Sequence, residues 1–185
     1  MTFSEYSKYM KSALDKVSQS EIDKLIELIL HAYKNEKMIF VIGNGGSAAN
    51  ASHFAQDLAK GTRKSLEQRK RIKALSLTDN LPFITALGND DGYETIFEQQ
   101  LRTFAQAGDL LIAISGSGNS PNIIKAVEWA NKNGITTIGI TGFNGGKLKQ
   151  INTYSLHVPL DDMCTSEGIH SSIMHYVILE LGKKI

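Results

Sequence analysis

Hydrophobic residues along this chain fall into short aliphatic runs separated by longer segments with helical periodicity. The runs span residues 38–42, 74–77, 110–114, 136–141 and, more weakly, 154–158. Nearly unbroken apolar runs of this length are typical of parallel strands covered on both faces. Their alternation with helical segments indicates crossover units. The pattern therefore predicts an α/β fold, a three-layer αβα sandwich around a five-stranded, mainly parallel sheet.

Two helical patterns precede the first strand. The first covers about residues 4–17, and the second begins at Ser20, a hydroxyl cap followed by carboxylates. An apolar stripe at helical spacing follows in the second pattern, formed by Ile22, Leu25, Ile26 and Ile29. We expect residues 1–35 to form a helical extension for oligomerisation, packing on the domain and on neighbouring subunits. Packing on the chain's own sheet alone is the alternative.

Length and composition narrow the classes of protein that remain. The 185 residues suit one domain, 1–185, with 42% hydrophobic and 21% charged residues. A net charge of +1 predicts neither a nucleic-acid nor a membrane partner. The basic run at 63–73 is interpreted as a solvated loop, with an anion-steering patch as the alternative. With one cysteine, Cys164, and no signal peptide or spanning segment, we expect a cytoplasmic protein.

Two loops carry the pattern of an anion site. Residues 115–121, Ser-Gly-Ser-Gly-Asn-Ser-Pro, follow a strand and open a helix, and residues 43–47, Gly-Asn-Gly-Gly-Ser, do the same after the first strand. Small residues let the backbone approach a ligand, and helix N–H groups favour a negative charge. Neither loop matches a nucleotide-binding motif. A phosphorylated metabolite is therefore the expected ligand, with an ordinary capped turn as the alternative.

Histidine and acidic side chains recur on two of the predicted helices. His53 and Asp57 lie four residues apart on one helix face, and Glu167 and His175 lie about two turns apart near the C-terminus. Two imidazoles and two carboxylates suit zinc or another divalent ion. The alternative is two unrelated surface pairs. We assign His170 to another side of its helix, at the surface or an interface.

Three further segments admit structural or functional interpretations. Residues 88–92 are an acidic turn or a binder of sugar hydroxyls, Asp161 and Asp162 cap the last helix, and residues 141–146 form a turn.

Taken in order, these motifs resemble the sugar isomerase (SIS) domain superfamily, and among its members the phosphoheptose isomerases. The resemblance covers nearly the whole chain. It implies a homotetramer that interconverts sedoheptulose 7-phosphate and D-glycero-D-manno-heptose 7-phosphate, with active sites at subunit interfaces and one zinc ion in each. The implied ligands of zinc are His53, Asp57, Glu167 and His175. The implied substrate-binding residues are Asn44, Gly45, Ser47, Asn89, Asp90, Ser115, Gly116, Ser117 and Ser120.

Several positions depart from the family pattern. Asp57 stands where relatives usually have Glu, Glu167 replaces Gln, Gly116 replaces Thr, and Thr165 replaces Arg. A shorter carboxylate at Asp57 displaces a base by about 1 Å, enough to slow proton transfer. Glu167 adds a negative charge that favours a divalent cation. These departures leave the phosphate loops intact and put the identity of the sugar in question.

The implied mechanism is aldose–ketose isomerisation through a cis-enediol. One carboxylate, Asp57 or Glu167, moves the proton between C1 and C2, and His175 is the complementary acid or base. Two other functions fit the same loops. One is a non-catalytic SIS adaptor that binds the replication initiator, and the other is a regulator that senses a sugar phosphate. Metal content separates them from the enzyme.

Overall fold

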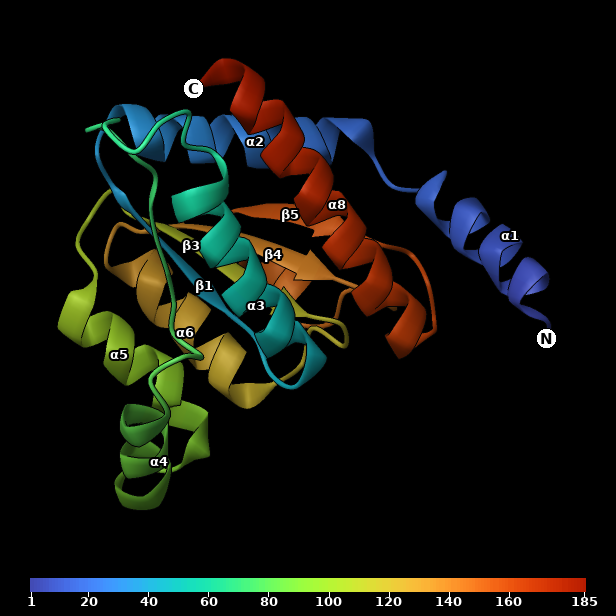
Figure 1. Ribbon diagram of the computed structural model, residues 1–185. Coiled ribbons are helices and arrows are strands. Elements are labelled where there is room, and N and C mark those ends of the chain that lie inside the picture. Colours follow the sequence, from blue (N-terminus) through green and yellow to red (C-terminus); the bar gives the residue numbers. More distant parts are fainter.

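Five parallel strands form one sheet in the computed structural model, which describes residues 1–185 (Figure 1). The spatial order is β2-β1-β3-β4-β5, and every neighbouring pair is parallel. The strands are β1 (Met38–Ile42), β2 (Lys73–Ser76), β3 (Leu110–Ser115), β4 (Thr136–Thr141) and β5 (Tyr154–His157). The predicted α/β class and five-stranded sheet are confirmed.

Eight α-helices connect and cover the strands. They are α1 (Phe3–Leu14), α2 (Gln19–Lys34), α3 (Gly46–Gln56), α4 (Leu81–Asp90), α5 (Ile96–Phe104), α6 (Pro121–Lys132), α7 (Leu148–Ile151) and α8 (Met163–Lys184). A π-helical turn, Asp57–Gly61, continues α3, and a 3₁₀ turn, Tyr93–Thr95, precedes α5. None of these helices is both long and apolar enough to cross a bilayer.

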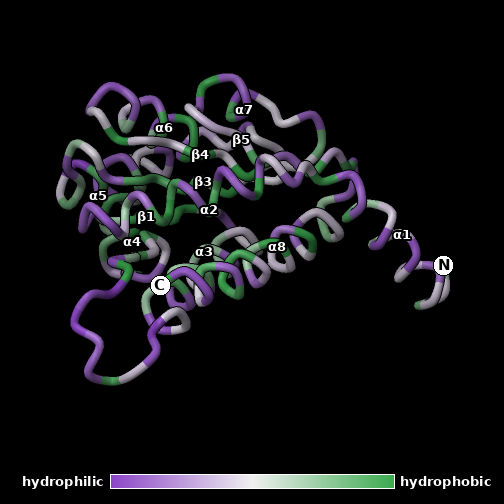
Figure 2. Tube along the Cα trace, turned by 90° about the horizontal axis from the view of Figure 1, so that it is seen from above, coloured by the Kyte–Doolittle hydropathy of each residue, from purple (hydrophilic) through white to green (hydrophobic).

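Side chains alternate between two hydrophobic cores, one on each face of the sheet. Ile39 and Val41 of β1 join the core under α2, α3 and α8, whereas Phe40 and Ile42 join the core under α5 and α6. This alternation follows from the two-residue period of a strand. In Figure 2 hydrophobic residues concentrate in the middle of the domain, and outlying loops are hydrophilic. The three layers therefore follow from strands that are apolar on both sides.

The two leading helices behave differently from each other. Leu25 and Ile29 of α2 are fully buried in the core, so this helix packs on the chain's own sheet. Helix α1 stands out from the rest of the molecule, and its Phe3 is 83% exposed (Figure 1). The N-terminal helical segment thus combines a core element with a largely exposed one.

Of the two interpretations of residues 88–92, an acidic turn or a binder of sugar hydroxyls, the turn interpretation is wrong for residues 88–90, which form the last turn of α4. Asn80 caps α4 by accepting a hydrogen bond from the Phe83 N–H at 3.2 Å, and Pro82 fits the first turn. The helix ends at Asp90 with Asp91 as its C-cap, and Gly92, whose φ is +92°, precedes the 3₁₀ turn at Tyr93–Thr95. The basic run at 63–73, in contrast, is loop as far as residue 72, as expected.

His170 is fully buried, which contradicts its expected place at the surface or an interface. Its Nε2–H donates to the Thr141 carbonyl at 3.2 Å, and its Nδ1 has no partner. Burial lowers the pKa of His170 to about 4, which the hydrogen bond to Thr141 only partly offsets. The side chain therefore packs as a neutral group between α8 and β4.

We predict that His170 makes the fold acid-sensitive. In the unfolded chain its pKa returns to about 6.5, so between pH 6.5 and 4 the unfolded state binds more protons. The contribution of His170 to the free energy of unfolding is fully present above pH 6.5. It declines as the pH falls towards 4, by a total on the order of 3 kcal/mol. Urea unfolding at several pH values measures this decline.

The His170→Gln variant should show a shallower pH dependence over that interval. The exposed His31 provides the matched control, because His31→Gln should leave the wild-type slope unchanged. Equal slopes in all three proteins would contradict the assignment.

Candidate functional site

The loops after β1 and β3 enclose a pocket of about 260 Å³ at the carboxyl edge of the sheet. β1 and β3 are neighbours in space, and their connections leave in opposite directions along the sheet. Such a switch point opens a crevice where ligands bind in doubly wound folds. The expected loop residues all line the pocket, namely Asn44, Gly45, Ser47, Ser115, Gly116, Ser117 and Ser120.

Two helix N-termini meet at this pocket. Helix α3 begins at Gly46 and α6 at Pro121, and neither preceding residue, Gly45 or Ser120, caps its helix with a side-chain hydrogen bond. Open N–H groups and the positive ends of two helix dipoles therefore act on the same space. This arrangement suits an anion such as a phosphoryl group.

The serine hydroxyls of the second loop are oriented by the backbone. Ser115 Oγ accepts from the Gly118 N–H at 3.1 Å, and Ser117 Oγ accepts from the Asn119 N–H at 3.3 Å. Since each oxygen already accepts a hydrogen bond, its own hydrogen is left to donate to a ligand. No lysine or arginine lines the pocket. An anion here is held by neutral donors.

Glu167 also lines this pocket. Its Oε1 accepts from the Ser47 hydroxyl at 3.4 Å, and its carboxyl packs so closely on Gly46 that a Cβ there would overlap it. The Ser47 hydroxyl hydrogen is therefore engaged by Glu167 instead of being free for a ligand. A carboxylate thus sits at the edge of an anion pocket.

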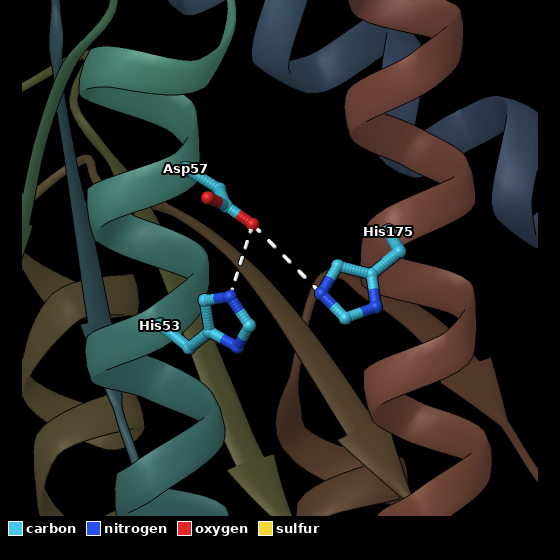
Figure 3. Close-up of side chains that lie close together, drawn as sticks. All are labelled: His53, Asp57 and His175. Carbon is cyan, nitrogen blue, oxygen red and sulfur yellow. Dashed lines mark ion pairs between the residues drawn. The ribbon is translucent and has the colours of Figure 1, made fainter.

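A second cluster joins α3 and α8 at His53, Asp57 and His175 (Figure 3). Asp57 Oδ2 lies 3.3 Å from His53 Nε2 and 3.9 Å from His175 Nε2. Two atoms that bind one zinc ion at its usual ligand distances lie no more than about 4.4 Å apart. Both separations satisfy this limit, and two imidazoles with a carboxylate are a donor set that zinc accepts. These residues therefore fit a divalent metal ion.

Glu167 is not part of this cluster. Glu167 and His175 share a face of α8, but eight residues correspond to about 12 Å along a helix axis. The six residues from Ser47 to His53 likewise correspond to about 9 Å along α3. The pocket and the cluster are therefore neighbouring levels of the same pair of helices. Glu167 contacts Ser47 in this structure, and its predicted role as a metal ligand beside His175 stays a prediction.

Asn89 and Asp90 lie away from this pocket. Both are exposed in the last turn of α4, where the Asn89 amide donates to Asp90 Oδ1 at 2.7 Å. Neither residue lines the pocket between the two loops.

Two departures from the family pattern have local explanations. A Cβ at Gly116 would meet the sulfur of Met163, which lines the pocket, so a larger residue at this position needs the flexible Met163 side chain to shift. Thr165 is fully buried, and its hydroxyl donates to Asp162 Oδ2 at 2.6 Å as part of the N-cap of α8. The expected capping by Asp162 is confirmed. Met163 precedes the expected start of α8 and went unnoticed because an isolated methionine carries no site signal.

Comparison with known proteins gives one consistent family. The family model described as "SIS domain" matches residues 3–142. A phosphoheptose isomerase from Clostridium acetobutylicum is 41% identical over 157 residues, covering 85% of this chain and 79% of the relative. One from Buchnera aphidicola is 37% identical over 185 residues, covering 99% and 94%.

A solved structure agrees with these relatives. The phosphoheptose isomerase GmhA from Neisseria gonorrhoeae superimposes with a TM-score of 0.88 at 31% identity, covering 97% of this chain and 94% of that one.

We predict that Gly118→Ala disrupts the anion pocket. Gly118 has a φ of +67°, and a Cβ would overlap the Gly145 carbonyl oxygen. Alanine disfavours a positive φ, and the Gly145 carbonyl oxygen belongs to the backbone, so it cannot move aside as a side chain could. We therefore expect Gly118→Ala to lower the free energy of unfolding by more than about 1 kcal/mol. Urea unfolding and calorimetric titration with inorganic phosphate measure the effect.

Gly182→Ala in α8 is the matched control, because no atom lies within 4 Å of a Cβ there. That change should leave phosphate binding intact and stability equal or slightly higher. A Gly118→Ala protein as stable as the control would show that the loop tolerates a side chain.

Proposed function

The chain belongs to the SIS domain family and, within it, to the phosphoheptose isomerases, and we propose that it interconverts sedoheptulose 7-phosphate and D-glycero-D-manno-heptose 7-phosphate. The observation that carries this proposal is the placement of two sites on the same pair of helices. An anion pocket lies at one level of α3 and α8, and a His/Asp cluster lies at another. One site suits a phosphate and the other suits the reacting carbons.

The separation of the two sites favours a long substrate. The backbone positions that contribute to them are offset by about 9 Å along α3 (Ser47 to His53) and about 12 Å along α8 (Glu167 to His175), from the helical rise. A sugar whose phosphate and carbonyl lie at opposite ends of a chain of several carbons spans such a distance. We therefore expect a triose phosphate to be a poorer substrate than a longer sugar phosphate.

We assign a divalent metal ion to His53, Asp57 and His175, with zinc as the ion that this donor set favours. The fit rests on the two nitrogen–oxygen separations in this cluster. A metal ion bound there supplies Lewis-acid polarisation of a carbonyl and the adjacent hydroxyl. Glu167 as a fourth ligand remains a prediction from the family resemblance, since its carboxyl contacts Ser47.

The chain's own residues then divide the remaining work. The hydroxyls of Ser115, Ser117 and Ser120 and the N-termini of α3 and α6 anchor the phosphate and fix the position of the carbon chain. A carboxylate removes the proton from one of the two carbons and returns it to the other, through a cis-enediol. Asp57 and Glu167 are the two candidates, and Glu167 already lines the pocket. His175 exchanges the proton of the sugar oxygen.

Two non-catalytic functions compete with this proposal. An adaptor for the replication initiator needs neither the phosphate pocket nor the cluster, and a sugar-phosphate sensor needs only the pocket. The convergence of His53, Asp57 and His175 from two helices favours the enzyme, because neither alternative has a use for it.

The proposal includes a homotetramer in the cytoplasm. Exposed apolar side chains on the outer helices support association, among them Phe3 of α1 and Leu179 of α8, which is 66% exposed. Asn89 and Asp90 would then contact the sugar in a site shared between subunits. Cys164 is a free, exposed thiol, which suits a reducing compartment.

We predict that His175→Ala lowers kcat with sedoheptulose 7-phosphate by about 100-fold or more, since general acid–base groups contribute on this scale. Formation of the aldose, followed across a panel of ketose phosphates of three to seven carbons, measures this. His31→Ala on the exposed part of α2 should behave as wild type. If the wild-type protein turned over no member of the panel, the proposed isomerase activity would be refuted.

We also predict that zinc binding distinguishes the two carboxylates. Asp57→Asn should weaken zinc binding by more than about tenfold, because even a partner of a metal ligand costs 10–100-fold when removed. Glu167→Gln should retain zinc, since its carboxyl lies outside the cluster. Titration of metal-free protein with zinc compares the variants. An equal loss in both would make Glu167 a metal ligand.

A further inference from the structure

A pair of side-chain amides joins the two loops of the anion pocket. Asn44 follows β1, and Asn122 lies in the first turn of α6. Asn44 Nδ2 donates to Asn122 Oδ1 at 2.9 Å, and Asn122 Nδ2 donates to Asn44 Oδ1 at 2.9 Å. Asn122 is 1% exposed and does not line the 260 Å³ pocket, whereas Asn44 does. The pair therefore couples a buried residue to one that meets the ligand.

The backbone of α6 fixes which way this pair points. The Ile123 N–H donates to Asn122 Oδ1 at 2.9 Å, so that oxygen must face the helix N-terminus. The Asn44 amide must then present its nitrogen to the Asn122 oxygen. A helix N–H group thus determines the orientation of a side chain on the opposite loop.

Tyr93 completes the arrangement from the 3₁₀ turn before α5. Its hydroxyl donates to Asn44 Oδ1 at 3.0 Å, so that oxygen accepts two hydrogen bonds and its lone pairs are used. Asn44 Nδ2 has given one hydrogen to Asn122 and keeps one. The only hydrogen-bonding capacity that the Asn44 side chain has left is that single N–H donor.

We propose that Asn122 and Tyr93 are positioning residues that make Asn44 a dedicated donor to the substrate's phosphate. An amide in the reversed orientation would turn its oxygen towards the pocket and repel an oxyanion. The two residues prevent that reversal by occupying the oxygen. The inference rests on the proposed phosphate site, and it does not require that the chain be an isomerase.

The test is a double-mutant cycle in which calorimetry measures the dissociation constant of inorganic phosphate. Asn44→Ala and Asn122→Ala should each weaken binding by about tenfold, since a hydrogen bond to a charged group has that value. If Asn122 acts through Asn44, the double variant should also be weakened by about tenfold. An effect near 100-fold in the double variant would mean independent actions and would overturn the proposal.

Tyr93→Phe keeps the test decisive if the buried Asn122→Ala variant fails to fold. Tyr93 is 59% exposed, so its hydroxyl can be removed without disturbing the core. It should weaken phosphate binding about threefold in the wild type and leave it unchanged in the Asn44→Ala background. The same effect in both backgrounds would overturn the proposal.

Asn133→Ala, at the exposed C-terminal cap of the same helix, is the matched control and should bind phosphate as wild type. The outcome is separable from that of the proposed function. Wild type that binds phosphate and turns over no sugar refutes the isomerase alone, whereas wild type that binds no phosphate refutes the site.

Discussion

The parallel pairing of β1 with β3 is the contact on which the site depends. Because these two strands are neighbours and their following helices leave on opposite faces of the sheet, the N-termini of α3 and α6 end at one crevice. The serines, glycines and amides at those termini acquire a common function only through this pairing. A slip of one residue in the register would turn Ile39 and Val41 towards the opposite core and displace both loops.

Helices α3 and α8 add the second level of the site. They lie against the same face of the sheet. Phe54 of α3 and Met174 of α8 belong to the hydrophobic core on that face and lie next to the His/Asp cluster. The cluster itself lies where α3 passes into a π-helical turn at Asp57. Such turns reorient a side chain relative to an ideal helix and recur at functional sites. Asp57 itself keeps α-helical backbone geometry, with φ −66° and ψ −39°, and its N–H still donates to the His53 carbonyl. The π-helical turn therefore redirects the chain only beyond Asp57, and the Asp57 and His53 side chains share one face of α3.

Much of this could be predicted from the sequence, for identifiable reasons. The strands were predicted from the aliphatic runs. The residues of both loops were predicted from serines and glycines that stand between a strand and the start of a helix. The rest depended on distances between segments. The contact of Glu167 with Ser47 depends on how α8 lies against α3, and the burial of His170 depends on β4. The end of α4 was not predicted because Gly88 and Asn89 are residues typical of turns. The Asn44–Asn122 pair joins residues 78 positions apart, which no local pattern indicates.

The absence of a cationic side chain from the anion pocket has a consequence for how the ligand comes and goes. Coulombic pairs with Lys or Arg weaken steeply as ionic strength rises, whereas hydrogen bonds from hydroxyl and amide groups in a partly enclosed crevice are screened far less. Affinity for the phosphate should thus depend less on salt than it would in a site built on Lys or Arg, with the helix dipoles as the remaining salt-sensitive contribution. Without a fixed counter-charge in this pocket, release of the phosphate end of the product requires only neutral hydrogen bonds to break.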